Sequence, residues 1–201
     1  MACDRSNLAW RLNWYRHSEL EGALLLGRMV RTADDPQLVL ALTRHCADEA
    51  RHAWLWARTI AELNLPTVQI FRSYQSFYAD EGGAPGNLLE VLALTHIFEQ
   101  RVDTEFRREL QDRSLPAAAV RTFRALVADE QDHLDWVGRW LAEQPGADAV
   151  VERFKRIDEA VYERIQPHLD NIAGIAGLGR ELPCDAGAAT FVEKEMNHVA
   201  H

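Results

Sequence analysis

Apolar residues recur every three or four positions along most of this chain, which is the period of an amphipathic α-helix. Turn-forming residues interrupt the pattern at Asp35-Pro36, at Ser114-Leu115-Pro116 and at Pro145-Gly146. The pattern therefore predicts five long helices, over residues 7–32, 36–63, 87–112, 116–143 and 147–169.

The segment 64–86 differs from the helices because it contains three glycines and two prolines among several aromatic residues. We interpret it as a connection that crosses the bundle and contains a short helix at 68–78. A short link, a long crossover and a short link are the ferritin-like way to join four helices. The prediction is an all-α, ferritin-like four-helix bundle over residues 1–146. An additional C-terminal helix and a Gly- and Ala-rich tail, residues 147–201, would pack on it.

Two of the predicted helices carry the same short motif. One is Asp48-Glu49-Ala50-Arg51-His52 and the other is Asp129-Glu130-Gln131-Asp132-His133. In each, the Glu and the His are three residues apart and project from one helix face, which is the apolar face. An ionised carboxylate is costly to bury without a partner, and a metal cation would supply that partner.

Single glutamates interrupt the apolar stripes of the other two helices. Glu19 precedes Glu49 by 30 residues, and Glu99 precedes Glu130 by 31, so the chain resembles two similar hairpins. One Glu from each of two helices plus Glu-x-x-His from each of two others is a di-metal carboxylate pattern. Glu21 is the alternative to Glu19. The predicted metal ligands are Glu19, Glu49, His52, Glu99, Glu130 and His133.

Neighbouring residues are candidates for supporting roles. A metal-bound His usually donates its second N–H to a carboxylate, so Asp48 could orient His133 and Asp129 could orient His52 across the bundle. A surface Asp is the alternative for both. Tyr15 lies one turn before Glu19 and could donate to a bound oxygen species, with core packing as the alternative. His45 and His96, each about one turn before a predicted ligand, are either outer partners of the site or core residues.

Composition limits the partners and the compartment. The 201 residues are 47% hydrophobic and 26% charged, with a net charge of −9, and an acidic surface repels nucleic acid on average. The three cysteines are far apart and form no CxxC pair. The first ten residues do not resemble a signal peptide, and no apolar run is long enough to span a bilayer. We expect a cytoplasmic protein with no membrane partner.

The motifs resemble the ferritin-like di-iron superfamily over about residues 8–143. The phrase from Asp48 to His52 is also similar to the DExRH phrase of bacterial multicomponent monooxygenases. In layout the chain resembles the MiaE family of tRNA hydroxylases, with Asp132 standing where that family carries Arg. The matching positions are His17 with Glu19, Glu49 to His52, Phe98 with Glu99, and Val151 to Phe154.

The resemblance implies an enzyme with two iron ions, or manganese in their place. It would activate dioxygen as a hydroxylase or monooxygenase and oxidise an organic substrate, which in the MiaE family is a tRNA. It would need an external electron donor and would be a monomer or homodimer. The alternative is a ferroxidase, iron-storage or peroxide-scavenging protein of the ferritin or rubrerythrin type. Rubrerythrins, however, carry a further Glu where Val102 stands, and bacterioferritins carry a haem-binding Met where Ala50 stands. A structural helical bundle without metal is the third hypothesis.

Overall fold

The computed structural model describes residues 4–82 and 84–182, and the protein is all-α apart from two three-residue strands. The helical fold class and the five long helices predicted from the sequence are confirmed. The elements in chain order are α1 (Arg5–Val30), α2 (Pro36–Glu62), β1 (Val68–Ile70), α3 (Tyr74–Gly82), α4 (Leu88–Glu109), α5 (Ala117–Ala142), α6 (Ala147–Ile165), the 3-10 segment η1 (Gln166–Gly174) and β2 (Gly179–Glu181).

Local chemistry fixes where the long helices begin. The Asp35 side chain accepts hydrogen bonds from the amides of Gln37 and Leu38, and Pro36 occupies the first turn of α2, where no N–H is needed. Asn87 caps α4 in the same way, by accepting from the amide of Glu90. Gly146, with φ of 77°, allows the sharp turn from α5 into α6.

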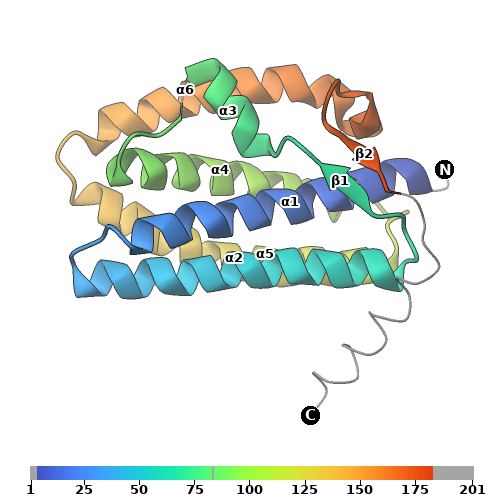
Figure 1. The fold of residues 1–201 in the computed structure, drawn as a ribbon, viewed down its shortest axis with the longest axis horizontal. Helices are drawn as coiled ribbons and strands as arrows, with labels where there is room; N and C mark the ends of the chain where they lie inside the picture. The colour runs from blue at the N-terminus through green and yellow to red at the C-terminus, as the bar shows by residue number, and fades with distance from the viewer. Residues whose placement is uncertain (1–3, 83, 183–201) are drawn as a thin grey trace, which may run out of the picture.

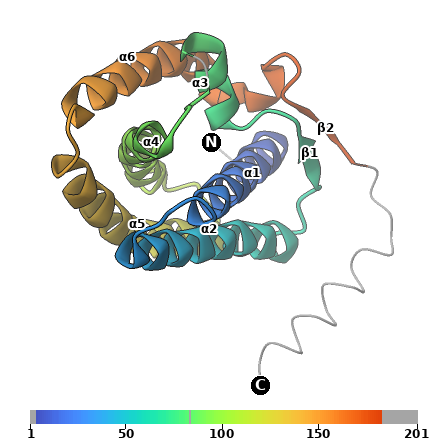
Figure 2. The same ribbon diagram turned by 60° about the vertical axis from the view of Figure 1, so that its left-hand side comes forward.

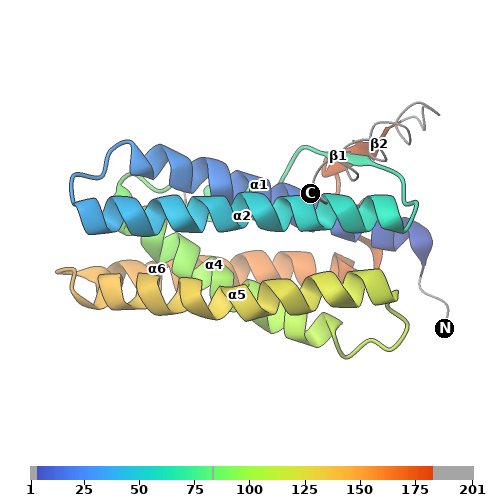
Figure 3. The ribbon, with the colours of Figure 1, turned by 90° about the horizontal axis from the view of Figure 1, so that it is seen from below.

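The helices form three layers (Figures 1 and 2). α2 and α5 lie side by side in the first layer, and α1 and α4 form the second. α6 and α3 cover the outer side of α4 and α1 and make the third layer. Figure 3 shows the two hairpins, α1 with α2 and α4 with α5, as separate pairs. α2 and α4 run in the same direction, so the connection between them has to travel back along the molecule.

Two parts of the chain differ from the sequence prediction. The prediction of a short helix at 68–78 is wrong, because β1 occupies Val68–Ile70 and α3 begins only at Tyr74. β1 pairs antiparallel with β2, with Val68 opposite Glu181. The predicted fifth helix ends at Ile165 instead of continuing to 169, because Pro167 cannot donate to a helical hydrogen bond, and η1 follows. The predicted tail beyond 182 lies outside the described residues.

Two clusters of buried apolar side chains lie on either side of the middle of the bundle. One gathers residues such as Leu8, Leu12, Phe106 and Phe123. The other extends from Leu42 and Leu92 to the third layer. Among the described residues, none of the helices is both long and apolar enough to cross a membrane.

Candidate metal centre

One face of α2 is buried along its whole length and changes from apolar to ionisable in the middle. Leu42, His45, Glu49, His52 and Trp56 follow one another at helical spacing, and each is at most 6% exposed. The apolar residues at the two ends of this stripe pack into the two clusters described above. The three ionisable residues therefore lie at the centre of the bundle.

The other three helices of the bundle present their own ionisable residues to the same region. Glu130 and His133 of α5 are 2% and 3% exposed. Glu19 of α1 and Glu99 of α4 are 5% and 4% exposed. All six ligands predicted from the sequence are thus buried. Glu21, the alternative to Glu19, is exposed and lies beside His17 instead.

Ligand atoms of these residues form two groups, each with its members' atoms within 4.8 Å of one another. The first group is His45, Glu49, Glu99 and His133, and the second is Glu19, Glu49 and His52. Glu49 belongs to both. Glu130 also lies between them, because one of its oxygens is 3.8 Å from His52 Nδ1 and the other is 3.6 Å from His133 Nδ1. Glu49 and Glu130 thus reach both groups, and this arrangement could hold metal.

His45 is part of the cluster, a place that the sequence left open. Its Nε2 is 2.7 Å from Glu99 Oε1, and its ring stacks on that of His133 at 3.8 Å between centroids. The equivalent position before Glu130 in α5 holds Leu126, so the two similar hairpins differ here. The spacing 45–49–52 on one helical stripe is the signal available in the sequence, and it fits a core histidine equally well.

Several buried atoms of the cluster have no hydrogen-bond partner. They are Glu49 Oε1, Glu99 Oε2, Glu130 Oε2, His52 Nδ1, His133 Nδ1 and both ring nitrogens of His45. Buried polar atoms are nearly always partnered, so a concentration of unpartnered ones needs an explanation. Ligand atoms of these residues lie close together, yet several of them form no hydrogen bond. Ligand atoms around a metal ion have the same arrangement.

Burial and close mutual approach shift the pKa values of the residues in the cluster. Burial, followed by the negative charges of neighbouring glutamates, raises the pKa of Glu19 and of Glu49 well above the usual value. Burial also raises the Glu130 pKa. Burial lowers the His52 pKa to about 4, which leaves this imidazole neutral at physiological pH. Burial lowers the His133 pKa too, but the Glu130 carboxylate 3.6 Å away and the charges of nearby glutamates outweigh that effect and raise it.

Aspartates of the opposite helix lie behind the two histidines of the motifs. Asp129 Oδ2 is 3.2 Å from His52 Nε2, and Asp48 Oδ2 is 3.4 Å from His133 Nε2. These are the cross-bundle pairs expected from the sequence. Arg51 donates to Asp129, and although burial alone would raise the pKa of this Asp, the hydrogen bonds from Arg51 and His52 lower it.

Tyr15 and His96 belong to neither of the two groups of ligand residues. The Tyr15 hydroxyl donates to Glu109 Oε1 at 3.3 Å, and its ring packs against Trp56 and Phe106. These contacts are those of a core residue, and the donation to an oxygen species stays a prediction. His96 pairs with Gln100 on the half-exposed side of α4.

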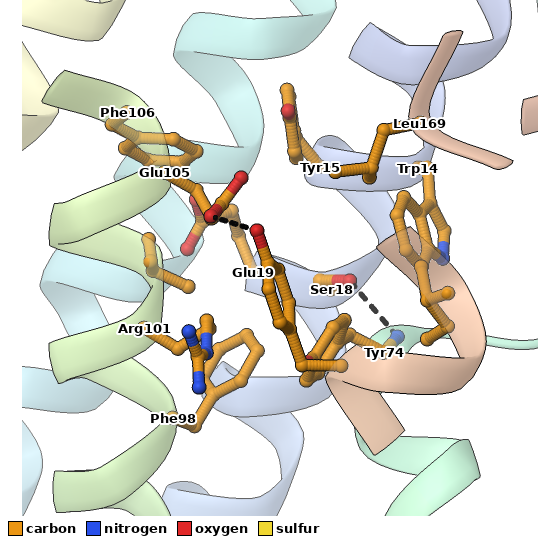
Figure 4. Close-up of a pocket in the computed structure, with 13 residues that line it drawn as sticks. Trp14, Tyr15, Ser18, Glu19, Tyr74, Phe98, Arg101, Glu105, Phe106 and Leu169 are labelled. Atoms are coloured by element: carbon orange, nitrogen blue, oxygen red, sulfur yellow. Dashed lines mark hydrogen bonds between the residues drawn. The ribbon is translucent and has the colours of Figure 1, made fainter. Parts of the chain in front are cut away.

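The two outer faces of the cluster are hollowed in different ways. Between α2 and α5, a pocket of about 610 Å³, including its open mouth, reaches His45 and His133 past Arg44, Asp48 and Asp132. On the opposite side, a pocket of about 560 Å³ between α1, α4 and α6 has mainly aromatic and aliphatic walls and reaches Glu19 (Figure 4).

No family model matches this chain, and neither the curated proteins nor the solved structures include one that matches it. Its function is therefore argued from the site.

Proposed function

We propose that this chain is a ferritin-like di-iron protein, an oxidoreductase that activates dioxygen and oxidises an organic substrate. The observation that carries the proposal is the central cluster of four buried carboxylates and three histidines, whose unpartnered atoms converge. Several charges of one sign are not buried together without compensation, and two cations would provide it.

The donor set fits iron. Carboxylate and imidazole ligands suit iron and manganese, whereas thiolates, which favour zinc or iron–sulfur clusters, are absent from the cluster. Glu49 and Glu130, which reach both ligand groups, would help to hold both ions. His45, Glu99 and His133 would complete one position, and Glu19 and His52 the other. His45 would make the two positions unequal.

The polar neighbours would prepare the histidines to bind. With Asp129 at His52 Nε2 and Asp48 at His133 Nε2, the proton of each neutral imidazole stays on Nε2. The Nδ1 lone pair is then free, and Nδ1 is the atom that faces the glutamates. The apolar clusters on both sides along the bundle would keep water away from the two ends of the site. A bound Fe(II) pair supplies the electrons that reduce dioxygen, and an external donor restores them.

A substrate-oxidising enzyme is favoured over iron storage by the apolar pocket that reaches Glu19. The likeness to tRNA hydroxylases would require a basic mouth around the site. The arginines available for one are Arg107, Arg108, Arg113, Arg121 and Arg124. Three of these five are neutralised, since Arg107 pairs with Asp103, Arg108 with Glu105 and Arg121 with Glu62. We therefore favour a small organic substrate over a tRNA.

The test is to load the metal-free protein with Fe(II) under argon, record its Mössbauer spectrum, add one pulse of dioxygen and record the spectrum again. We expect a coupled iron pair that is oxidised by the pulse in wild type and is absent from Glu130→Gln. Size-exclusion chromatography separates the alternatives, since we expect a monomer or dimer and storage requires a cage. Isolated single irons, or a large cage, would contradict the proposal.

A further inference from the structure

The pocket between α1, α4 and α6 is built mainly from aromatic side chains. Figure 4 shows Trp14 and Tyr15 on one side, with Phe98 and Phe106 on the other, and Glu19 between them. The space of about 560 Å³ that it encloses includes its open mouth. Rings of this kind offer large apolar contact area and stack well on a planar ligand.

The charged residues at this pocket are already partnered within the protein. Arg101 donates to Asp158 Oδ2 at 2.9 Å and 2.6 Å, and its guanidinium lies over the Tyr162 ring. Glu105 accepts from the Tyr162 hydroxyl at 2.9 Å. A charged ligand would lose its hydration without gaining a free partner here, so the pocket favours an uncharged one.

A second, smaller pocket of about 340 Å³, including its open mouth, shares Phe98 as a wall with the first. It reaches His45, Glu49 and Glu99 directly. Gly22 forms part of its wall, and a Cβ at this position would lie only 2.9 Å from Glu49 Oε2. Glycine thus allows α1 to approach the carboxylate while leaving space beside it.

Besides the atoms of His45, Glu49 and Glu99 that belong to the cluster, the inner pocket has one further unpartnered polar group, the Gln75 amide. Gln75 Nε2 donates to the Ser18 carbonyl at 3.0 Å, which fixes the orientation of the amide. Gln75 Oε1 is buried and has no hydrogen-bond partner. Apart from the carboxylates that the proposed function assigns to metal ions, the pocket therefore offers one acceptor to a ligand that carries one donor.

We propose that the two pockets bind a small, uncharged aromatic molecule with a single hydroxyl or amino group, which donates to Gln75 Oε1. The inference rests on the proposed function in one respect, namely that this molecule is the substrate oxidised at the metal centre. Phe98 lies between the outer pocket, through which the ligand would arrive, and the carboxylates.

The test compares four probes on the full chain by titration calorimetry, with metal content measured on the same samples. The probes are phenol, toluene, benzoate and adenosine 5′-monophosphate. We expect phenol to bind best, toluene more weakly, and the two anions not to bind. Binding of benzoate or of the nucleotide in preference to phenol would overturn the proposal and would favour an anionic or nucleic-acid substrate.

Matched variants locate the binding. Val102→Phe fills the outer pocket and should weaken phenol binding by at least about tenfold, whereas Ala41→Phe, in the polar pocket of the opposite face, should not. Gln75→Leu should weaken phenol by about threefold to tenfold and leave toluene unchanged. Unchanged phenol binding in Val102→Phe would overturn the proposal. The comparison of the four probes on wild type tests the proposal even if a variant does not fold.

The two proposals can fail separately. Wild type that holds two metal ions but binds neither phenol nor toluene would contradict the inference alone. Wild type that binds phenol but takes up no metal would contradict the proposed function and leave the pocket as a binding site.

Discussion

The two faces of the buried cluster differ in the chemistry that surrounds them. On the α2 and α5 face, charged residues meet the imidazoles, with Asp129 and Asp48 behind the histidines and Arg44 bridging to Asp132. On the α1 and α4 face, aromatic rings and a glycine lie beside the carboxylates. The same cluster therefore has a polar side and an apolar side.

The difference separates two tasks that a metal enzyme has to perform. Polar neighbours orient ligands and set the proton positions on the histidines. An apolar approach admits an organic molecule and keeps water away from the reacting atoms. The comparison predicts that changes on the polar face alter metal affinity, and that changes on the apolar face alter ligand binding.

The largest effect is expected from His45→Leu, which places in α2 the residue that α5 has at the equivalent position. One metal position loses a ligand, so the affinity for one of the two ions should fall by more than about 100-fold, beyond the loss typical of an outer partner. Competition with a chelator measures it. His96→Leu, one turn before Glu99 but outside the cluster, is the control. Unchanged affinity in His45→Leu would show that His45 is only a core residue.

Asp129→Asn should have the next largest effect. It removes the carboxylate behind His52 and should weaken metal binding by about 10- to 100-fold without abolishing it. Asp135→Asn, which removes a charge from the same helix at a residue that pairs with Gln131 instead of a histidine, should change the affinity little. Equal effects of the two variants would indicate general electrostatics instead of orientation of the imidazole.

A smaller, pH-dependent effect is expected from Glu19→Gln in the metal-free protein. Because burial and neighbouring charges raise the Glu19 pKa, the folded state holds this proton more tightly than the unfolded state does. The stability contributed by the proton is complete below the ordinary pKa of 4.5 and is lost as the pH rises toward the raised value.

Metal-free Glu19→Gln should therefore match wild type near pH 4.5 and exceed it in free energy of unfolding at pH 8, as measured by urea denaturation. With metal bound, the order at pH 8 should reverse, because the variant lacks a ligand. Glu21→Gln, at an exposed position of the same helix, is the control. A stability difference that does not change with pH would contradict the raised pKa of Glu19 in the folded state.

The smallest expected effect on metal affinity is that of Val102→Phe, which tests directly whether the polar and apolar faces act separately. Val102→Phe lies on the apolar face and should leave the metal affinity within about twofold of wild type while weakening phenol binding. A large loss of metal in this variant would show that the two faces are not separate.

Much of the fold follows from local signals in the sequence. The second predicted helix, 36–63, is α2 at Pro36–Glu62, because Asp35 and Pro36 mark its start chemically. The strand pair could not be predicted: β1 has only three residues, and its partner lies more than 100 residues away in a segment of Gly, Arg and Glu. Such pairing depends on the packed bundle and not on either segment alone.

The residues of the site that belong to a repeated motif could be predicted from the sequence, whereas the residue without a counterpart in the other hairpin could not. The two Glu-x-x-His motifs identify Glu49, His52, Glu130 and His133 because each motif supports the other. His45 has no counterpart in α5, so its place in the cluster emerges only when Glu99 of α4 is brought within 2.7 Å. The pockets depend on how α6 and α3 cover α1 and α4, which no local pattern encodes.

The most direct measurement is metal content per chain, by elemental analysis of wild type, Glu49→Gln and Glu21→Gln produced with iron. The account predicts about two iron ions per wild-type chain, loss of most of the metal in Glu49→Gln, whose carboxylate belongs to both ligand groups, and no loss in Glu21→Gln. Wild type that binds no metal, even after anaerobic reconstitution with Fe(II) or Mn(II), would contradict the central claim.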